Sequence, residues 1–210
     1  MNYTEIIDMA LSFADREYHA KIVSRIDNLL RLVESRINRR LKREGLTDQV
    51  DIAIIGGTEY YNLPSNFNGI SNINIRATAG ATTRQTLVYR TVEKLSDYAN
   101  IAETNDVVYY TIVNNKLQII PTPDGKVIDL IYYIKIPELT SVATENDIST
   151  NDPDCYIFGL LVEINSFVKD KDAAAIWDSR FNAVLDEMNM NDFKHKYLGA
   201  QLTIVPDDSF

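Results

Sequence analysis

The sequence contains few of the residues that build catalytic and metal sites. Its 210 residues include two histidines, His19 and His195, and one cysteine, Cys155. Each histidine lies at a predicted helix boundary and outside any HExxH spacing, where a surface or capping role is expected. Cys155 lies on the apolar side of a predicted helix start, which indicates a small buried side chain rather than a nucleophile. One cysteine cannot form an internal disulfide, so folding is expected in a reducing compartment or independently of redox state.

Signatures of membranes, nucleotides and calcium are also missing. No apolar run approaches the roughly 18 residues that a membrane span needs, and the start MNYTEIIDMA lacks the basic and apolar regions of a secretory signal. The doublet Gly56-Gly57 lacks the GxGxxG spacing and precedes a predicted strand, which indicates a turn. The acidic segment 147–154 lacks the central glycine and final glutamate of a calcium loop. We therefore expect no enzyme, no cofactor, no metal and no membrane partner.

Charge is distributed unevenly along a chain whose formal net charge is −9. Residues 16–44 hold nine basic and four acidic side chains, whereas the rest of the chain holds 12 basic and 26 acidic ones. A basic segment on an acidic body can bind nucleic acid, or it can bind another copy of the acidic body. The hydrophobic fraction of 45% indicates one or two compact domains with a sizeable core.

Two helices are predicted before residue 46. Thr4 is a suitable N-cap for the first, which would end near Glu17. The second would begin near Ala20 and end at Gly45 as its C-cap. Its apolar side chains recur every three or four positions, which is typical of one long amphipathic helix. These side chains are Ile22, Ile26, Leu29, Leu30, Val33, Ile37 and Leu41.

Residues 46–137 have the composition of a β domain, rich in Ile, Val, Thr and Tyr with Gly, Asn and Pro between short runs. Asn114-Asn115 suits a two-residue hairpin turn because Asn tolerates positive φ. Residues 91–99 are the exception and predict a short helix. The predicted strands are 52–55, 59–63, 70–76, 85–89, 107–113, 116–120 and 127–136. This density of strands favours a small antiparallel sandwich or barrel.

Two more helices are predicted after a polar loop that ends near residue 151. Asp152 and Pro153 suit the N-cap and first position of one helix, and the next helix carries Trp177. The segment after residue 194 has no helical spacing and is predicted to be extended, with a short strand at 202–205.

The predicted fold class is therefore α+β. The N-terminal and C-terminal helices each need a partner for their apolar faces, and one helical bundle provides it for both. An antiparallel β sandwich or barrel-like domain is inserted between them. The predicted divisions are the N-terminal bundle helices at 1–45, the inserted β domain at 46–137, a loop with the C-terminal bundle helices at 138–194, and an extended C-terminal tail at 195–210.

Arginines of the second helix are the candidate binding residues. They are Arg31, Arg36, Arg39, Arg40 and Arg43. Local pairs, Glu34 with Asn38 and Arg40 with Glu44, account for part of the charge but not for its excess. Sequence-specific DNA binding would need a compact helix-turn-helix unit or interleaved aromatic residues, and no Phe, Tyr or Trp lies between Tyr18 and Tyr60. A contact of these arginines with an acidic protein surface is the prediction from the residues, and nucleic-acid binding by the basic helix 31–43 is the alternative.

Four stretches of the sequence are specific in combination. The first is LVESRINRRL at 32–41, with its E-x-R-I-N-R pattern in a long helix. The second is YYNLPSNFNGISNINI at 60–75, and the third is NNKLQIIPTPDGKVIDLIYYIKIPELT at 114–140. The fourth is DPDCYIFGLLVEINSFVKDKDAAAIWDSRFNAVLDEM at 152–188, a helix pair with a Trp on its second helix. In this order they resemble the head-to-tail adaptor (connector) proteins of tailed bacteriophages, over residues 4–190.

The resemblance implies a structural protein without catalysis. It implies a homo-oligomeric ring, with twelve copies as the expected number, that joins the portal protein to the tail or to further neck proteins. The expected location is the head–tail junction of the virion, after synthesis in the cytoplasm of the bacterial host. DNA would pass through the lumen during genome ejection without specific binding. In such a ring a basic helix and an acidic body complement each other, so the five arginines are predicted to contact a neighbouring subunit or the portal.

The tail is the second candidate docking element. Its apolar residues could add a strand to the sheet edge of a neighbour or lie along the portal, and packing on its own bundle is equally open. These residues are Leu202, Ile204, Val205 and Phe210. A glycan-acting module is a third class of function, for which the β domain offers only scattered aromatic residues and no paired acids.

Overall fold

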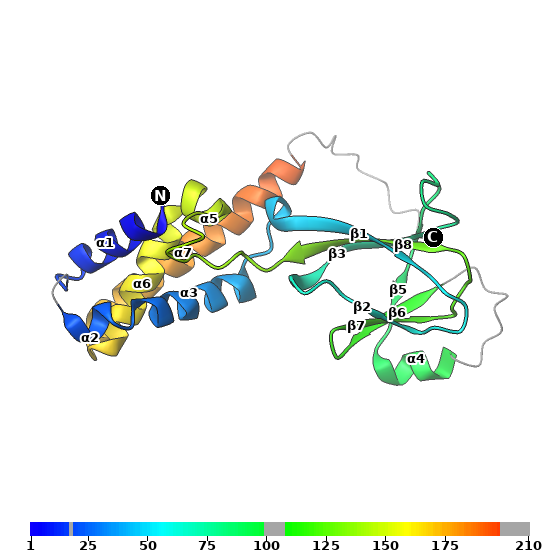
Figure 1. Cartoon of the computed structure of the whole chain (residues 1–210), viewed down its shortest axis with the longest axis horizontal. Coiled ribbons are helices and arrows are strands. Elements are labelled where there is room, and N and C mark those ends of the chain that lie inside the picture. The colour runs from blue at the N-terminus through cyan, green and yellow to red at the C-terminus, as the bar shows by residue number, and fades with distance from the viewer. Residues whose placement is uncertain (17–18, 99–107, 198–210) are drawn as a thin grey trace, which may run out of the picture. The chain divides into compact units, whose positions relative to one another are not determined.

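The computed structural model describes residues 1–16, 19–98 and 108–197 (Figure 1). The chain divides into two compact units, which we call the helical unit (Met1–Glu44 with Ile136–Phe210) and the β unit (Gly45–Lys135). Helices and antiparallel and mixed sheets occur together, which confirms the predicted α+β class. Among the described residues, no helix is both long and apolar enough to cross a membrane.

The helical unit is built around α6. Its helices are α1 (Tyr3–Phe13), α2 (Ala20–Val23), α3 (Ile26–Arg40), α5 (Asp147–Asn151), α6 (Pro153–Phe167) and α7 (Lys171–Tyr197). Helices α1, α3 and α7 all pack against α6 (Figure 1). Nine of the 15 residues of α6 are buried, because a helix covered by three others must be apolar or small on most of its surface.

The first helix begins earlier than predicted. Asn2, not Thr4, is its N-cap, since the Asn2 side chain accepts a hydrogen bond from the Glu5 N–H at 3.0 Å. The Glu5 carboxylate accepts from the Asn2 N–H in return, which completes a capping box. The helix ends at Phe13, before the predicted end near Glu17.

The predicted long second helix is interrupted and also ends early. A turn at residues 24–25 separates α2 from α3, and α3 ends at Arg40 instead of continuing to Gly45. Asn189 of α7 explains the early end. Its side chain accepts from the Lys42 N–H at 3.2 Å and donates to the Arg40 carbonyl at 3.3 Å. A partner far along the sequence therefore satisfies backbone groups that a helix end leaves unpaired.

Helix α6 approaches its neighbours most closely at Gly159. A Cβ atom at this position would lie 2.4 Å from Cγ1 of Val33 on α3 and 3.2 Å from Cε2 of Phe181 on α7. Both neighbours are 0% exposed, so neither can move aside without disturbing the surrounding core. The missing side chain therefore sets the distance between three helices.

The β unit contains two four-stranded sheets of order β1-β8-β3-β4 and β2-β7-β6-β5. The strands are β1 (Thr47–Ala53), β2 (Tyr60–Asn62), β3 (Phe67–Arg76), β4 (Gln85–Thr86), β5 (Val88–Tyr89), β6 (Tyr109–Val113), β7 (Lys116–Ile120) and β8 (Val127–Ile134). Residues of both sheets, among them Ile128 of β8 and Leu117 of β7, share one hydrophobic core. The Gly56-Gly57 pair forms the predicted turn, in which Gly57 has a φ of 79°.

The predicted strand 52–55 begins earlier, as β1 at Thr47–Ala53. Two further details of the β prediction are wrong, and two are confirmed. The predicted strand 85–89 is divided between β4 and β5, which belong to different sheets, and β5 pairs with β6 in parallel rather than antiparallel. The predicted short helix is present as α4 (Val92–Tyr98). Asn114 and Asn115 form the predicted hairpin turn, with φ values of 49° and 58°.

The C-terminal part also departs from the prediction. The polar loop was predicted to extend to residue 151, but α5 occupies its end because Asn146 and Ser149 form a capping box. Helix α7 continues to Tyr197, so the first three residues of the predicted tail are helical. Residues 198–210, with the candidate docking residues of the tail, lie outside the described residues.

We expect Gly159→Ala to destabilise the chain. Overpacking of a filled core costs about 1–3 kcal/mol, more than the roughly 1 kcal/mol that alanine gains over glycine inside a helix. The urea midpoint should fall in the wild-type background. It should change little, or rise, when the same substitution is made in a Val33→Ala background, since that removes the nearest atom. An equal fall in both backgrounds would show that contact with Val33 is not the cause.

Candidate protein interface around the arginine helix

Helix α3, which carries most of the predicted binding residues, is held in place by its apolar stripe. The stripe faces the core of the helical unit, and its buried residues are Ile26, Leu29, Leu30, Val33 and Ile37. The predicted stripe is therefore confirmed in its helical part. Buried apolar positions on one side fix the rotation of the helix and decide where each arginine points.

Arg36 connects α3 to both α6 and α7. One guanidinium nitrogen lies 3.5 Å from a carboxylate oxygen of Glu163, and the other donates to Asp178. The guanidinium carbon also lies 4.8 Å from the ring centroid of Phe181. The Arg36 side chain is only 25% exposed. It therefore acts within its own chain as a link between three helices.

Arg40 repeats this contact one turn further along. Its Nη2 lies 2.9 Å from Oδ1 of Asp186, and its Nη1 donates to the Asn182 side chain. Because Arg36 pairs with residue 178 and Arg40 with residues 182 and 186, α3 and α7 run side by side in the same direction. The side chain of Glu44, the predicted local partner of Arg40, lies outside the described residues.

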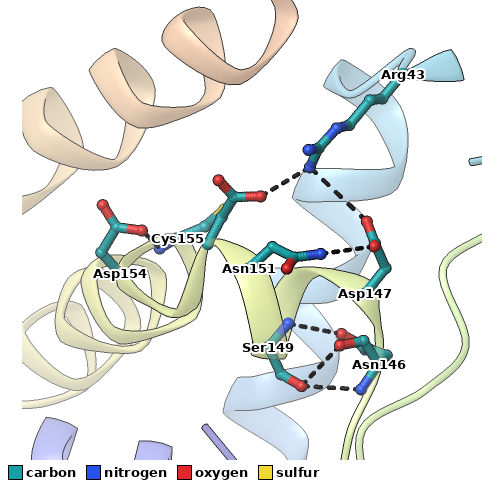
Figure 2. A network of polar contacts seen from close by, with 8 residues as sticks. Arg43, Asn146, Asp147, Ser149, Asn151, Asp154 and Cys155 are labelled. Carbon is teal, nitrogen blue, oxygen red and sulfur yellow. Dashed lines mark hydrogen bonds and ion pairs between the residues drawn. The ribbon is translucent and has the colours of Figure 1, made fainter. Parts of the chain in front are cut away.

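Arg43 lies beyond the end of α3 and reaches the junction of α5 and α6. Figure 2 shows its guanidinium directed at Asp147, with Asn151 and the Asn146–Ser149 capping box close by. Its Nη1 lies 2.7 Å from Oδ2 of Asp152 and 3.7 Å from Oδ2 of Asp147. The acidic segment 147–154 is thus partly neutralised by an arginine. In the part of the chain that the structure describes, no group of three or more His, Cys, Asp or Glu side chains could hold a metal ion.

Arg31 and Arg39 have different surroundings from the other three. Arg39 is exposed, and its Nη1 donates to the Ser35 hydroxyl at 3.3 Å. Arg31 lines a cleft of about 180 Å³. The other residues that line the cleft are Asp27, Glu34, Glu138, Leu139, Thr140 and Ser141. Within the described residues, neither arginine lies within 4.0 Å of a carboxylate.

Glu34 is a residue whose role the sequence pattern did not reveal. It is 5% exposed, and its Oε1 accepts a hydrogen bond from the Leu139 N–H at 2.7 Å. Asn38 accepts from the Ile136 N–H at 2.8 Å. Burial raises the pKa of Glu34, and the charge of nearby Glu138 adds to this rise, while hydrogen bonds from Leu139 and Tyr156 oppose it. The partners lie about a hundred residues away in sequence, so no local signal could have identified them.

Cys155 is buried, His19 is exposed, and His195 lies in α7. Cys155 is 0% exposed, and burial raises the pKa of its thiol, which disfavours the nucleophilic thiolate. The prediction of a small buried side chain is therefore confirmed. His19 is exposed and precedes α2 without a side-chain capping bond. His195 lies near the end of α7, inside the helix rather than at its predicted boundary.

Comparison with models of known protein families assigns the chain to one of them. The family model of the SU10 adaptor protein matches residues 1–202, which cover both units. The chain belongs to the SU10 adaptor protein family. This is a family of phage head-to-tail adaptor proteins, as the sequence resemblance implied, and it is not a family of enzymes. No match to the chain is found among curated proteins.

Membership of the SU10 adaptor family gives the arginine helix its context. A phage adaptor has a structural role at the virion neck, where it interacts with other phage proteins. The interface role predicted for the five arginines stays a prediction. What the structure adds is a division among them. Three form salt bridges with carboxylates of their own adaptor chain, whereas Arg31 and Arg39 form none with the described residues, and Arg31 acts on Glu34 through its charge alone.

We expect Arg36→Ala to destabilise the adaptor more than Arg39→Ala. Loss of the Arg36 contacts leaves Glu163 and Asp178 partly buried without their cation, which should cost about 1–2 kcal/mol. Removal of an exposed arginine such as Arg39 should cost less than about 0.5 kcal/mol. Urea denaturation of both variants provides the comparison. Equal losses would contradict the structural role that we assign to Arg36.

The raised pKa of Glu34 predicts a pH-dependent difference between the wild type and Glu34→Gln. An acid whose pKa is raised in the folded state contributes most stability when it is protonated in both states. That stability is lost as pH rises from the unfolded value, about 4.3, through the raised folded value. The stability of Glu34→Gln relative to wild type, from urea midpoints, should therefore increase with pH. A difference that stays constant as pH rises would contradict the raised pKa of Glu34.

Proposed function

We propose that the chain forms a closed ring at the head–tail junction, with twelve copies as the expected number. One end of the ring would dock on the portal protein, and the other would receive the tail or further neck proteins. The observation that carries this proposal is the family match over residues 1–202, which leaves almost no part of the chain for another role. The detailed fold that we propose for this function is a helical bundle with an inserted β sandwich.

The charge distribution supports passage of DNA without retention. Phosphate binding depends on lysine and arginine side chains that can exchange counterions for phosphates. The chain has a net charge of −9, and Arg36, Arg40 and Arg43 already contact carboxylates of the helical unit. Few cations of the basic helix therefore remain for a phosphate backbone. This weakens the alternative of nucleic-acid binding by helix 31–43.

The test is to mix the purified chain with the portal protein of the same phage. Multi-angle light scattering and negative-stain images should show a ring added to the portal. An isolated adaptor can be monomeric, so only assembly with the portal is decisive. A chain that leaves the portal bare and instead binds duplex DNA with a steep salt dependence would support the alternative.

Truncation after Tyr197 tests the tail in the same assay. We propose that Leu202, Ile204, Val205 and Phe210 dock on a neighbour or on the portal. The shortened chain should keep its urea midpoint but bind the portal at least about tenfold more weakly, as expected when several apolar contacts of an interface are lost. Unchanged portal binding would remove the tail from the mechanism.

A further inference from the structure

A loop of the helical unit presents an apolar side chain to solvent. Val142 is 92% exposed, the highest value among the exposed large hydrophobic residues in the described part of the chain. The turn that carries it is closed by the Thr140 N–H, which donates to the Ala143 carbonyl at 2.9 Å. The Thr140 hydroxyl accepts in addition from the N–H groups of Ala143 at 2.9 Å and of Val142 at 3.3 Å. Val142 is therefore held at the apex of a defined turn.

The base of this loop is fixed to the rest of the helical unit. The Tyr3 N–H donates to the Thr144 carbonyl at 2.8 Å, which joins the loop to the start of α1. The Asn146 side chain donates to the Pro137 carbonyl at 2.9 Å and so closes the two ends of the loop on each other. A loop that is ordered before it binds loses little conformational entropy on binding. The segment 137–146, which we call the valine loop, is therefore preorganised for a partner.

A second exposed apolar side chain lies on α3. Leu32 is 52% exposed and does not belong to the buried stripe of the helix. Arg39 lies seven positions after Leu32 on the same side of α3, and Arg25, the residue that precedes α3, lies seven positions before Leu32. Both arginines are exposed, and in the described part of the chain neither has a carboxylate within 4.0 Å. Arg25 instead lies 5.8 Å from the ring centroid of Phe167.

The valine loop and Leu32 lie on different sides of α3. Glu34 and Asn38 of α3 contact the segment that leads into the valine loop, through hydrogen bonds from Leu139 and Ile136. Arg36 points toward α7. Leu32 lies four residues before Arg36, at the solvent-exposed edge of the surface of α3 that faces α7. Val142 and Leu32 of one copy therefore do not meet each other. Two complementary patches on different sides of one subunit are what a heterologous, ring-forming contact requires.

Charge complements the apolar match. The valine loop contains Glu138 and Glu145 and no basic residue, and both glutamates are exposed. The Leu32 face carries Arg25 and Arg39. When carboxylates flank the apolar contact on one surface and arginines flank it on the other, the charges fix the register of the two surfaces. They also disfavour contact between two identical patches, because like charges would then face each other.

We propose that the valine loop of one copy docks on the Leu32 face of α3 in the next copy. Val142 contacts Leu32, and Glu138 and Glu145 meet Arg25 and Arg39. This inference rests on the proposed ring and names the contact between its neighbours. It also assigns Arg39 to the subunit interface, while Arg36 and Arg40 keep their own chain's carboxylates.

Cysteine cross-linking tests the contact directly. The native Cys155 is fully buried, so cysteines introduced at Val142 and Leu32 are the reactive ones. On the portal, under mild oxidation with copper phenanthroline, the double variant V142C/L32C should give a disulfide ladder that extends beyond the dimer. A mixture of the two single variants should give disulfide-linked dimers and nothing larger, because each copy then carries a single introduced cysteine. V142C/I176C is the control, since Ile176 is 58% exposed on α7, and it should give no ladder.

Charge exchange provides a second readout without cysteines. E138K/E145K and R25E/R39E should each weaken ring assembly at least about tenfold, and the variant with all four substitutions should recover most of the loss. Urea midpoints close to wild type confirm that each variant is folded. Ring formation by the wild-type chain is measured in parallel. A ring without the V142C/L32C ladder overturns this inference and leaves the proposed function intact, whereas a bare portal overturns both.

Discussion

The burial of α6 is the constraint on which the rest of the helical unit depends. Most of this helix is apolar or small, so it must be covered on several sides, and the covering helices come from both ends of the sequence. Because Gly159 has no side chain, α3 and α7 can approach α6 closely enough to cover it. Once α3 and α7 lie side by side, the arginines of one face the carboxylates of the other. The electrostatic contacts are thus a consequence of apolar packing.

This order of causes changes the interpretation of the basic run. Considered alone, the run Glu34 to Glu44 is an excess of positive charge on an acidic chain and indicates a binding surface. In the folded chain, Arg36, Arg40 and Arg43 form ion pairs with acidic residues at α5, α6 and α7. Most of the excess therefore stabilises the subunit itself. The face that remains for a partner is narrower, and it combines a leucine with two arginines.

The sequence predicted much of the fold because the patterns are local. The apolar stripe of α3, the Asn114-Asn115 hairpin and the helix that begins at Pro153 follow from spacing and from residue conformational preferences. The errors arose where a distant residue decides the outcome. Asn189 ends α3 before the predicted glycine, and β5 joins a different sheet from β4 although only one residue separates them.

The candidate site shows the same division. The identities of the arginines were evident, but their partners were not, because those partners lie more than a hundred residues away. Leu32 was visible as a leucine outside the stripe, and Val142 as an isolated apolar residue in a polar loop. Neither signal has meaning until the structure shows that both side chains are exposed and fixed in position.

In the proposed ring, α3 is held to its own copy through Arg36 and Arg40 and meets a neighbour only through its remaining face. An electron cryo-microscopy reconstruction of the chain on its portal, at a resolution that shows side chains, can distinguish the partners of these arginines. We expect a closed ring in which Arg36 contacts Asp178, and Arg40 contacts Asp186, of the same copy. A ring in which these arginines pair instead with carboxylates of the adjacent copy would contradict this expectation.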